Sequence, residues 1–418
     1  MLKNEHKIRV GFYSPGWPLS HMPNGIVSYI ENIIDGFKNG DLETKIEPVV
    51  LTGKLAGNEV NDNLIDTSRF AQNITLQQQL IDKLLHKLTM PSLEFIKYQR
   101  FILPEVHTIL QGMHNLCTPL NILEIEESFG VPSFLVEKSK VPIVTRLHGP
   151  WFIHGPIMNL DTAANYKLRV LKEGEAISQS HGISSPSLDV LEKTREYYNI
   201  QLPNAKVIPN PVREVNSENL WRYNVINRPY ILVVGRFDLH KGGDIALQAF
   251  RLIAIKNKEV ALCFVGPDGG ISIGGKILNI NEYMNKFIPE EDIRKRIDFR
   301  GHCNPEQISA LRKNSLVTMF PSRYENLPLS LLEALAAGCP TVSTPVGGIK
   351  EILINEFNGL VAEPQSPESM AEKVLNLLDD PAKMQRLSKN AIEDTKKRFS
   401  AKIVAGQTAD LYKKVLAF

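Results

Sequence analysis

The sequence predicts an α/β protein made of two Rossmann-like, doubly wound domains. Buried-type strands alternate with amphipathic helices in the first half of the chain, and the same alternation starts again near residue 229. Between the two runs, residues 211–228 are polar and show no hydrophobic period, so we take them as a linker. The expected domains are therefore 1–210 and 229–400.

Charge, cysteine content and hydrophobicity argue against several classes of protein. The chain has 48 basic and 46 acidic residues, and this near balance gives no electrostatic case for nucleic acid as a partner. Its four cysteines are scattered without a C-x-x-C pair, so we expect no disulfide framework and a cytoplasmic, reducing environment. No stretch approaches the roughly 20 apolar residues of a membrane span, and the apolar run at the N-terminus is too short for a signal peptide.

The chain opens with a strand, a loop and a helix. The strand is IRVGFYS (8–14), and the helix is expected from about Ile26. Gly25, at the start of this helix, would let the backbone approach a ligand closely, although a plain turn is the alternative. The loop contains no G-x-G-x-x-G, so a nicotinamide- or flavin-dependent dehydrogenase loses its main support.

Further first-half strands are expected at 46–53, 120–128 and 141–149. His148 lies just past the buried part of the last one, at the carboxyl edge where ligands bind in open parallel sheets. The alternative for this histidine is a structural role.

Two features of the first half have two interpretations each. Residues 84–103 form an amphipathic helix with basic residues, which is either an ordinary packed helix or a site of weak peripheral membrane contact. Trp17, Trp151 and Phe152 either form a platform for an acceptor or serve packing.

The second half is organised around residues 316–344, which predict strand, loop, helix and strand. The loop carries Glu325, and the helix, from about Leu329, carries Glu333. Backbone N–H groups and the positive dipole end at such a helix start suit a phosphate. A carboxylate one turn further can accept two hydroxyl hydrogen bonds, as a ribose diol offers. The alternatives are a capping box from Ser330 to Glu333 and a solvated Glu325.

An earlier loop, GRFDLHKGG (235–243), also follows a strand and enters a helix. Arg236 and Lys241 in it are suited to a diphosphate, or form a solvated pair. GISIGGKI (270–277) nearly matches a Walker A loop, but Ile277 stands where Mg²⁺ would need Ser or Thr, so we exclude a nucleoside triphosphatase. The sequence has no Asp-x-Asp and no His/Cys cluster with metal spacing.

Together these segments carry a family resemblance. GRFDLHKG, FRGH and FPSRYENLPLSLLEALAAGCPTVSTPVGGIKEIL resemble the second domain of retaining glycosyltransferases of the GT4 family, which have the GT-B fold of two Rossmann-like domains facing across a cleft. The spacing from Glu325 to Glu333 matches that family's E-x7-E signature. The Gly25 loop, RLHG, SSPS and VIPNPV agree more loosely. The resemblance is strong for 230–362 and thin for 54–120.

The resemblance implies transfer of a hexose-type sugar from a nucleotide-diphosphate sugar, a UDP- or GDP-sugar, to a hydroxyl acceptor. The acceptor would be a glycan, a lipid-linked sugar or a small molecule, as in polysaccharide biosynthesis. Retention of configuration and independence of metals and other cofactors are implied as well. Arg236 and Lys241 would hold the diphosphate, and Glu333 the ribose hydroxyls. Backbone amides near Leu329 and Ser330 would hold the leaving phosphate.

Further roles follow from the same resemblance. Glu325 would contact the donor sugar near the reacting carbon, and His148 would contact the same sugar. The base would lie near Cys303, and the Gly25 loop would approach the phosphate. The last helix, 401–418, would cross back to the first domain.

The sequence departs from the family's pattern at several positions. Two adjacent glycines are expected where residues 23–25 read Pro-Asn-Gly, and Asn326 and Pro328 replace glycines after the first glutamate. Pro328 has no N–H, so one phosphate donor is missing. Gly149 replaces an acidic neighbour of the histidine, and Asn210 is followed by proline rather than glycine. None of these changes removes a side chain assigned to chemistry.

Two rival functions remain open. One is a nucleotide-sugar epimerase or hydrolase of GT-B fold, against which the E-x7-E spacing and the Arg/Lys pair argue. The other is a non-catalytic sugar-nucleotide-binding protein. The presence of Glu325, Arg236 and Lys241 together argues against it, since binding alone would not need all three.

Overall fold

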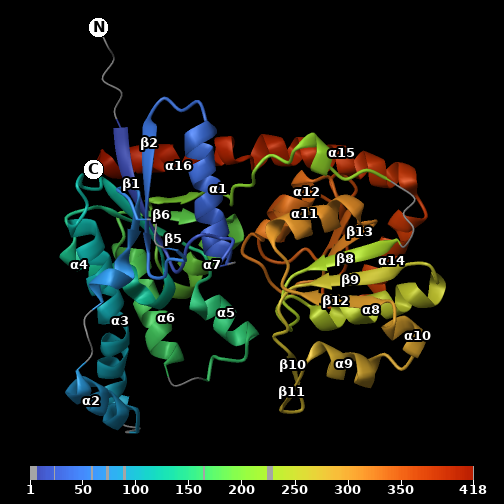
Figure 1. The fold of residues 1–418 in the computed structure, drawn as a ribbon, viewed down its shortest axis with the longest axis horizontal. Helices are drawn as coiled ribbons and strands as arrows, with labels where there is room; N and C mark the ends of the chain where they lie inside the picture. Colours follow the sequence, from blue (N-terminus) through green and yellow to red (C-terminus); the bar gives the residue numbers. More distant parts are fainter. Residues whose placement is uncertain are drawn as a thin grey trace. The chain divides into compact units, whose positions relative to one another are not determined.

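The computed structural model describes residues 7–22, 24–57, 60–71, 75–87, 91–162, 165–223 and 229–417. The chain divides into two compact units. One comprises Met1–Pro209 with Val404–Phe418, and the other Asn210–Ile403. Each unit holds one parallel sheet with helices around it (Figure 1), so the prediction of an α/β protein with two Rossmann-like domains is confirmed.

The sheet of the first unit has the strand order β3-β2-β1-β4-β5-β6-β7, with parallel pairing throughout. Short 3-10 turns lie at Thr67–Phe70 and Ser128–Gly130. The strands and helices of this unit are β1 Lys7–Ser14, α1 Gly25–Asn39, β2 Lys45–Thr52, β3 Leu64–Asp66, α2 Leu76–Lys87, α3 Pro91–His114, β4 Ile122–Glu126, α4 Val131–Lys138, β5 Ile143–Arg146, α5 Trp151–Ile157, α6 Tyr166–Gln179, β6 Gly182–Ser185, α7 Leu188–Tyr198, β7 Ala205–Val207 and α16 Ala401–Leu416.

Both faces of this sheet are buried, as a parallel sheet requires. Alternate residues of β1 point to opposite faces. Phe12 contacts Phe37 of α1, which in turn contacts Tyr412 of α16. Tyr13 lies on the other face and packs with Ile102 of α3 and its neighbours. The sheet is therefore covered by α1 and α16 on one side and by α3 on the other.

The sheet of the second unit has the strand order β12-β9-β8-β13-β14-β15, again all parallel, beside a separate hairpin of β10 and β11. Its elements are a 3-10 turn Ser217–Asn219, β8 Tyr230–Val234, α8 Gly243–Lys256, β9 Ala261–Val265, β10 Ile271–Ile273, β11 Lys276–Leu278, α9 Ile280–Phe287, α10 Glu291–Arg294, β12 Ile297–Gly301, α11 Pro305–Asn314, β13 Val317–Phe320, α12 Leu329–Ala336, β14 Thr341–Ser343, α13 Ile349–Ile352, β15 Leu360–Val361, α14 Pro367–Leu378 and α15 Pro381–Arg398.

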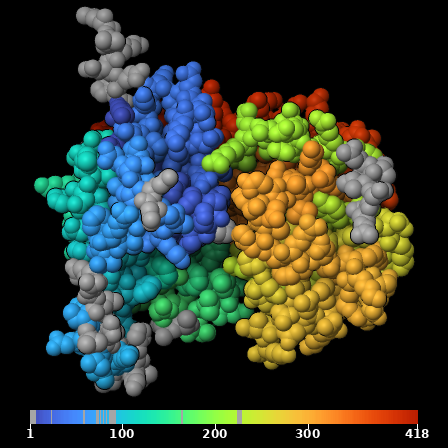
Figure 2. All heavy atoms as spheres, in the orientation of Figure 1, coloured from blue at the N-terminus to red at the C-terminus, as the bar shows by residue number. Residues whose placement is uncertain are grey.

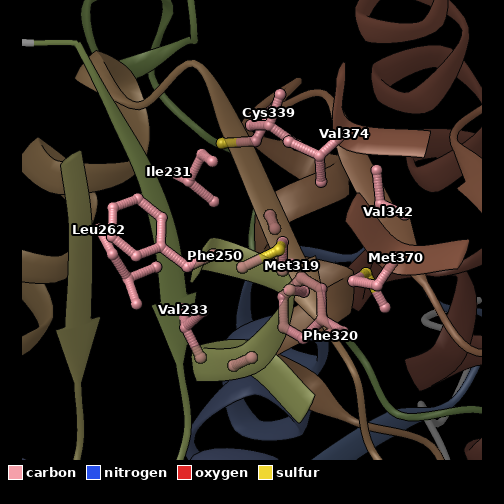
Figure 3. Packing of buried hydrophobic residues seen from close by; sticks show 14 of the residues in the cluster. Ile231, Val233, Phe250, Leu262, Met319, Phe320, Cys339, Val342, Met370 and Val374 are labelled. Carbon is pink, nitrogen blue, oxygen red and sulfur yellow. The ribbon is translucent and has the colours of Figure 1, made fainter. Parts of the chain in front are cut away.

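Figure 3 shows the core of this second unit. Side chains of the central strands interlock with side chains from helices that cover the sheet. This packing fixes the strands from whose ends the site loops start. The labelled residues are Ile231, Val233, Phe250, Leu262, Met319, Phe320, Cys339, Val342, Met370 and Val374.

The segment that resembles a Walker A loop forms the antiparallel hairpin of β10 and β11, with Ile273 opposite Lys276. A phosphate-binding loop of that type connects a strand to a helix, so the structure agrees with the exclusion of a nucleoside triphosphatase.

The segment expected as a linker contributes to the second unit as far as the structure describes it. Val212 bridges to Ser400, and the buried indole of Trp221 donates to the carbonyl of Ser315 at 2.6 Å. Residues 224–228 lie outside the described part of the chain. The short strand β3 falls in a stretch that the sequence predicted to be mostly helical.

The amphipathic segment 84–103 belongs to two helices, the end of α2 and the first part of α3, with 88–90 outside the described residues. Figure 2 shows α2 on the surface of the first unit. Several large apolar side chains of these helices are exposed, with Leu84 at 62% and Phe101 at 63% the most open. In the described part of the chain, no helix combines the length and the apolar character of a membrane span.

Candidate active site

The second unit brings two predicted site loops together because β8 and β13 are neighbours in its sheet. The loop after β8 carries Arg236 and Lys241, and the loop after β13 carries Glu325. Both loops start at carboxyl ends of parallel strands and each enters a helix, α8 or α12. This is the edge at which open parallel sheets bind ligands.

The centre of this cluster is an ion pair. The Nζ of Lys241 lies 2.6 Å from Oε1 of Glu325, and the hydroxyl of Ser322 donates to the same oxygen at 2.8 Å. The side chain of Glu325 is only 9% exposed. Burial acts to raise the pKa of this carboxyl, but the Lys241 ammonium, the nearby His240 and the two hydrogen bonds hold it below its ordinary value. Glu325 is therefore an ionised, fixed carboxylate.

Asp238 organises the loop after β8. One of its oxygens accepts the backbone N–H of Lys241 at 2.7 Å, and the other forms an ion pair with Arg236. The Arg236 side chain remains 43% exposed. The loop thus presents two cations, one open to solvent and one turned towards Glu325.

Arg323 connects the two loops. Its backbone N–H donates to the carbonyl of His240 at 2.9 Å, and its Nη1 donates to the carbonyl of Leu239 at 2.7 Å. Its guanidinium also makes two parallel bonds to Asp244, at 2.8 and 2.7 Å. Such a two-bond arrangement fixes geometry as well as distance. Arg323 therefore holds the loop after β13 against the start of α8.

Two glycines allow the close backbone approach behind the site. Gly242 has a φ of +70°, and a Cβ there would lie 2.0 Å from the carbonyl oxygen of Pro321. Gly347 has a φ of +52°, and a Cβ there would lie 2.0 Å from the carbonyl oxygen of Glu325. Only glycine fits either position without moving the loops.

Helix α12 begins directly after the Glu325 loop. Pro328 is its N-cap and makes no side-chain cap bond, so Leu329 and Ser330 occupy the first turn. The alternative of a capping box from Ser330 is wrong, because Ser330 lies inside the helix. N–H groups of a first turn have no partner within the helix. Oε2 of Glu333, one turn on, accepts from Nη2 of Arg312 at 2.6 Å.

Cys303 follows β12 at the edge of the sheet, with β9 between β12 and β8. The residue is half-buried and packs against a small apolar cluster that includes Cys263 and Leu311. The structure therefore keeps Cys303 at the rim, apart from the ion pair.

In the first unit, His148 follows β5, and one carboxyl group binds its backbone and that of the next residue. Glu127 accepts the backbone N–H of His148 at 2.8 Å and that of Gly149 at 2.6 Å. The imidazole meets the ring of Tyr29 edge-on, with 5.1 Å between centroids. Burial and the charge of Arg146 hold the pKa of His148 well below its ordinary value. The ring is therefore neutral at physiological pH.

Burial, together with Glu173 and Glu126, raises the pKa of Glu127 to about 8. Glu173 is also buried, and it accepts the backbone N–H of Trp151 at 2.6 Å. Two buried carboxyl groups thus fix the loop that follows β5.

Gly25 is the first residue of α1, exposed, with open space where a Cβ would lie. Asn24 caps this helix by accepting the N–H of Ile26 at 2.8 Å, while the neighbouring Pro23 lies outside the described residues. Phe152 stacks on Tyr197 with centroids 4.2 Å apart.

The Arg169 guanidinium lies 3.8 Å from the centroid of the Trp151 ring. Phe152 and Trp151 therefore have packing partners, as the packing interpretation of these aromatic residues expected.

Sequence reasoning missed several residues of these clusters. Asp238 and Ser322 lie inside the motifs already assigned to the site, so their position could have identified them. Glu127 follows a second glutamate at the end of a buried strand, in EIEES, and this pattern could have identified it. No sequence feature distinguished Arg312 from a solvated basic residue on a helix. Among the described residues, no group of three or more His, Cys, Asp and Glu side chains is placed to hold a metal ion.

Comparison with known proteins shows which family the second half of the chain resembles. Residues 219–394 match the family of glycosyl transferases group 1. An uncharacterized glycosyltransferase of Methanocaldococcus jannaschii is 30% identical over 183 residues, which cover 44% of each chain. The chain spans about half the length of the curated relatives it matches. The resemblance to group 1 glycosyltransferases is confirmed for this part of the chain, and these matches support the predicted transferase enzyme.

Solved structures match over nearly the whole chain. Sucrose-phosphate synthase from Thermosynechococcus elongatus has a TM-score of 0.72 at 17% identity, covering 98% of this chain and 99% of that one. The Anabaena protein HepE in complex with UDP-glucose has a TM-score of 0.66 at 16% identity, covering 97% and 100%. At these identities the likeness shows the fold, and the predicted GT-B fold is confirmed.

Proposed function

We propose that this protein is a retaining glycosyltransferase of the GT4 family that moves a hexose-type sugar from a nucleotide-diphosphate sugar to a hydroxyl acceptor. The observation that carries the proposal is the fixed Lys241–Glu325 pair at adjacent strand ends, in front of the first turn of α12. In the proposal, this lysine, the exposed Arg236, the first N–H groups of α12 and the ionised Glu325 act on one bound donor. An anionic leaving group and a sugar carbon that gains positive charge need those groups together.

In this proposal, the diphosphate is bound by positive charge from the protein. Arg236 is exposed and supplies a planar fork, while Lys241 supplies a point charge. The amides of Leu329 and Ser330 add donors at the positive end of the helix dipole. As the bond from the anomeric carbon to oxygen breaks, these groups meet the charge that builds on the departing phosphate. We infer that the reaction needs no metal, because the protein supplies the neutralising cations.

The remaining site residues would hold the two ends of the donor. Glu333 would bind the ribose hydroxyls with the oxygen that Arg312 does not use, and the base would lie near Cys303. Glu325 and His148 would contact the transferred sugar, with the neutral imidazole acting as a hydrogen-bonding group. Gly25, exposed at the start of α1, would leave room for the phosphate.

The acceptor would be a glycan, a lipid-linked sugar or a small molecule, as in polysaccharide biosynthesis in the cytoplasm. The exposed apolar side chains of α2 and α3, such as Leu84 and Phe101, support weak peripheral contact with a membrane that presents a lipid-linked acceptor. Sedimentation with anionic vesicles tests this, and a doubly substituted Leu84→Ser, Phe101→Ser protein should lose the binding. Equal sedimentation of both proteins would remove these helices from the proposal.

Two alternatives predict different products. A GT-B epimerase or hydrolase would rearrange the donor or release free sugar without an acceptor, and a non-catalytic binding protein would leave the donor intact. Product analysis of the donor with and without acceptors therefore separates the three functions.

The first experiment is a melting-temperature panel with UDP, GDP, ADP and TDP in excess EDTA. A ligand that binds only the folded state stabilises by about 2.7 kcal/mol at a hundred times its dissociation constant. We expect one diphosphate, most simply UDP, which HepE binds in its solved complexes, to raise the midpoint. The Arg236→Ala, Lys241→Ala double variant should show little shift, and Arg251→Ala, whose ion pair to Glu290 lies elsewhere, should behave as wild type. No shift with any nucleotide, with or without Mg²⁺, would overturn the donor site.

A further inference from the structure

A buried carboxylate in the first unit joins two helices that are distant in sequence. Glu124 on β4 accepts the hydroxyl of Tyr29, from α1, on Oε1 at 2.7 Å. Its other oxygen, Oε2, accepts the hydroxyl of Tyr412, from α16, at 2.8 Å. Glu124 is 288 positions from Tyr412 in the chain, and all three side chains are buried. The last helix is therefore connected to the first by two hydrogen bonds through one residue of the sheet.

This connection leads to the imidazole of His148. The ring of Tyr29 meets that imidazole edge-on at 5.1 Å and an interplanar angle of 72°. The guanidinium of Arg146 lies 4.1 Å from the centroid of the same tyrosine ring. Arg146 is held by the hydroxyl of Ser184 at 3.3 Å and the carbonyl of Ile208 at 3.1 Å. The ring of Tyr29 thus contacts both a fixed cation and His148, while its hydroxyl is bonded to the carboxyl group of Glu124.

Packing alone does not explain the polar groups at this place. Tyr412 already contacts Phe37, which contacts Phe12, so a phenylalanine would fill the same space. Burial raises the pKa of Glu124, while Arg146 and the two tyrosine hydroxyls oppose that rise. A buried carboxylate costs desolvation and needs its partners. In return, the carboxyl group orients both tyrosine side chains, since each hydroxyl donates its single hydrogen to one of the two oxygens of Glu124.

We propose that Tyr412 is a positioning residue for His148, acting through Glu124 and Tyr29. The hydroxyl of Tyr412 fixes the carboxylate, the carboxylate fixes the hydroxyl of Tyr29, and the ring of Tyr29 supports the imidazole. The inference rests on the proposed function, in which His148 contacts the transferred sugar. It adds that the last helix takes part in shaping the site of the first unit.

The direct test observes the imidazole itself. In ¹⁵N-histidine-labelled protein, Tyr412→Phe should shift or broaden the ring signals of His148, assigned with His148→Gln. Tyr13→Phe is the matched control, because the Tyr13 hydroxyl donates to Glu105 at 2.8 Å on the opposite face of the sheet. If Tyr412→Phe does not fold, Glu124→Gln is measured in its place, since an amide keeps the shape and loses one acceptor. Unchanged His148 signals in a folded variant would overturn the proposal.

The second test is a double-mutant cycle on transfer activity. Tyr412→Phe should lower kcat several-fold with a smaller change in KM, and should lower it no further when His148 is already alanine. An equal loss in both backgrounds would mean that Tyr412 acts only on the general stability of the unit, and would contradict the proposal. A protein without any transferase activity would overturn the proposed function, while the ring signals would still decide the positioning role.

Discussion

Lys241 and Glu325 are 84 positions apart in the chain, yet Nζ of the lysine lies 2.6 Å from Oε1 of the glutamate. They meet because β8 and β13 are adjacent and parallel, so that their following loops leave the sheet at one edge. The pair keeps Glu325 ionised in a buried position. In the proposed function, the same lysine also binds the diphosphate of the donor.

The first prediction concerns the carboxylate of Glu325. If Glu325 contacts the sugar near the reacting carbon, as we propose, Glu325→Gln should lower the rate of transfer by about a hundredfold or more, because that negative charge is lost. Affinity for the nucleotide should change only a few-fold, since the diphosphate contacts remain. Steady-state kinetics and calorimetry measure the two quantities. Glu290→Gln, at the surface ion pair with Arg251, is the control, and full activity of Glu325→Gln would refute the assigned role.

The second prediction is a pH dependence of stability. The folded-state pKa of Glu325 is lowered, so its contribution to stability is present above the unfolded value, about 4.3, and is lost as the pH falls through the folded pKa. In Lys241→Met, burial would instead raise that pKa, and the loss of stability relative to wild type should be largest at neutral pH.

Urea denaturation at pH 7 and pH 4 measures the difference between the two proteins, which should shrink at the lower pH. Lys276→Met, at an exposed ion pair with Glu282, should show little difference at either pH. A constant difference between wild type and Lys241→Met would contradict the assignment.

The third prediction concerns Arg312, whose Nη2 holds Oε2 of Glu333. If Glu333 binds the ribose diol, wild type should prefer UDP over 2′-deoxy-UDP by about ten- to a hundredfold, because a hydrogen bond to a charged group contributes about 1.5–3 kcal/mol. Arg312→Met should reduce that preference, since the carboxylate is no longer oriented, and Glu333→Ala should abolish it. Lys313→Met serves as the control. An unchanged preference in Glu333→Ala would remove the diol from this site.

The fourth prediction is structural. Gly242→Ala should destabilise the second unit by about 2 kcal/mol or more, because alanine resists a positive φ and its Cβ would lie 2.0 Å from the carbonyl oxygen of Pro321. Gly235→Ala is the matched control in the same loop, where the nearest atom to a Cβ is 3.7 Å away. Denaturant midpoints measure both variants. Equal stability of the two would show that the loops can move apart at no cost.

The sequence determined most of the strands and helices of this protein, β3 being an exception. Runs of mostly apolar residues mark β8 and β13 in the sequence. A glycine, Gly338, stands after α12 and takes a positive φ of +76°. These features are local, because burial and backbone conformation follow from the residues of each segment. The spacing of Glu325 and Glu333 was local in the same sense. Local sequence patterns did not predict the structure of residues 270–277, which resemble a Walker A loop, because their hairpin is seen only in the pairing of β10 with β11.

Only the tertiary structure decided which of these groups meet. The strand order of the second unit sets Lys241 beside Glu325. The folded unit also lets Arg323 join the two loops and lets Arg312 donate a hydrogen bond to Glu333. In the first unit, the packing of α16 against the sheet brings Tyr412 to Glu124, which is 288 positions away in the chain. Spacing along the chain does not encode these pairs, because each depends on how distant strands and helices pack into one sheet. From the sequence alone, a single arginine or glutamate is expected to be solvated, because its partner becomes known only from the tertiary structure.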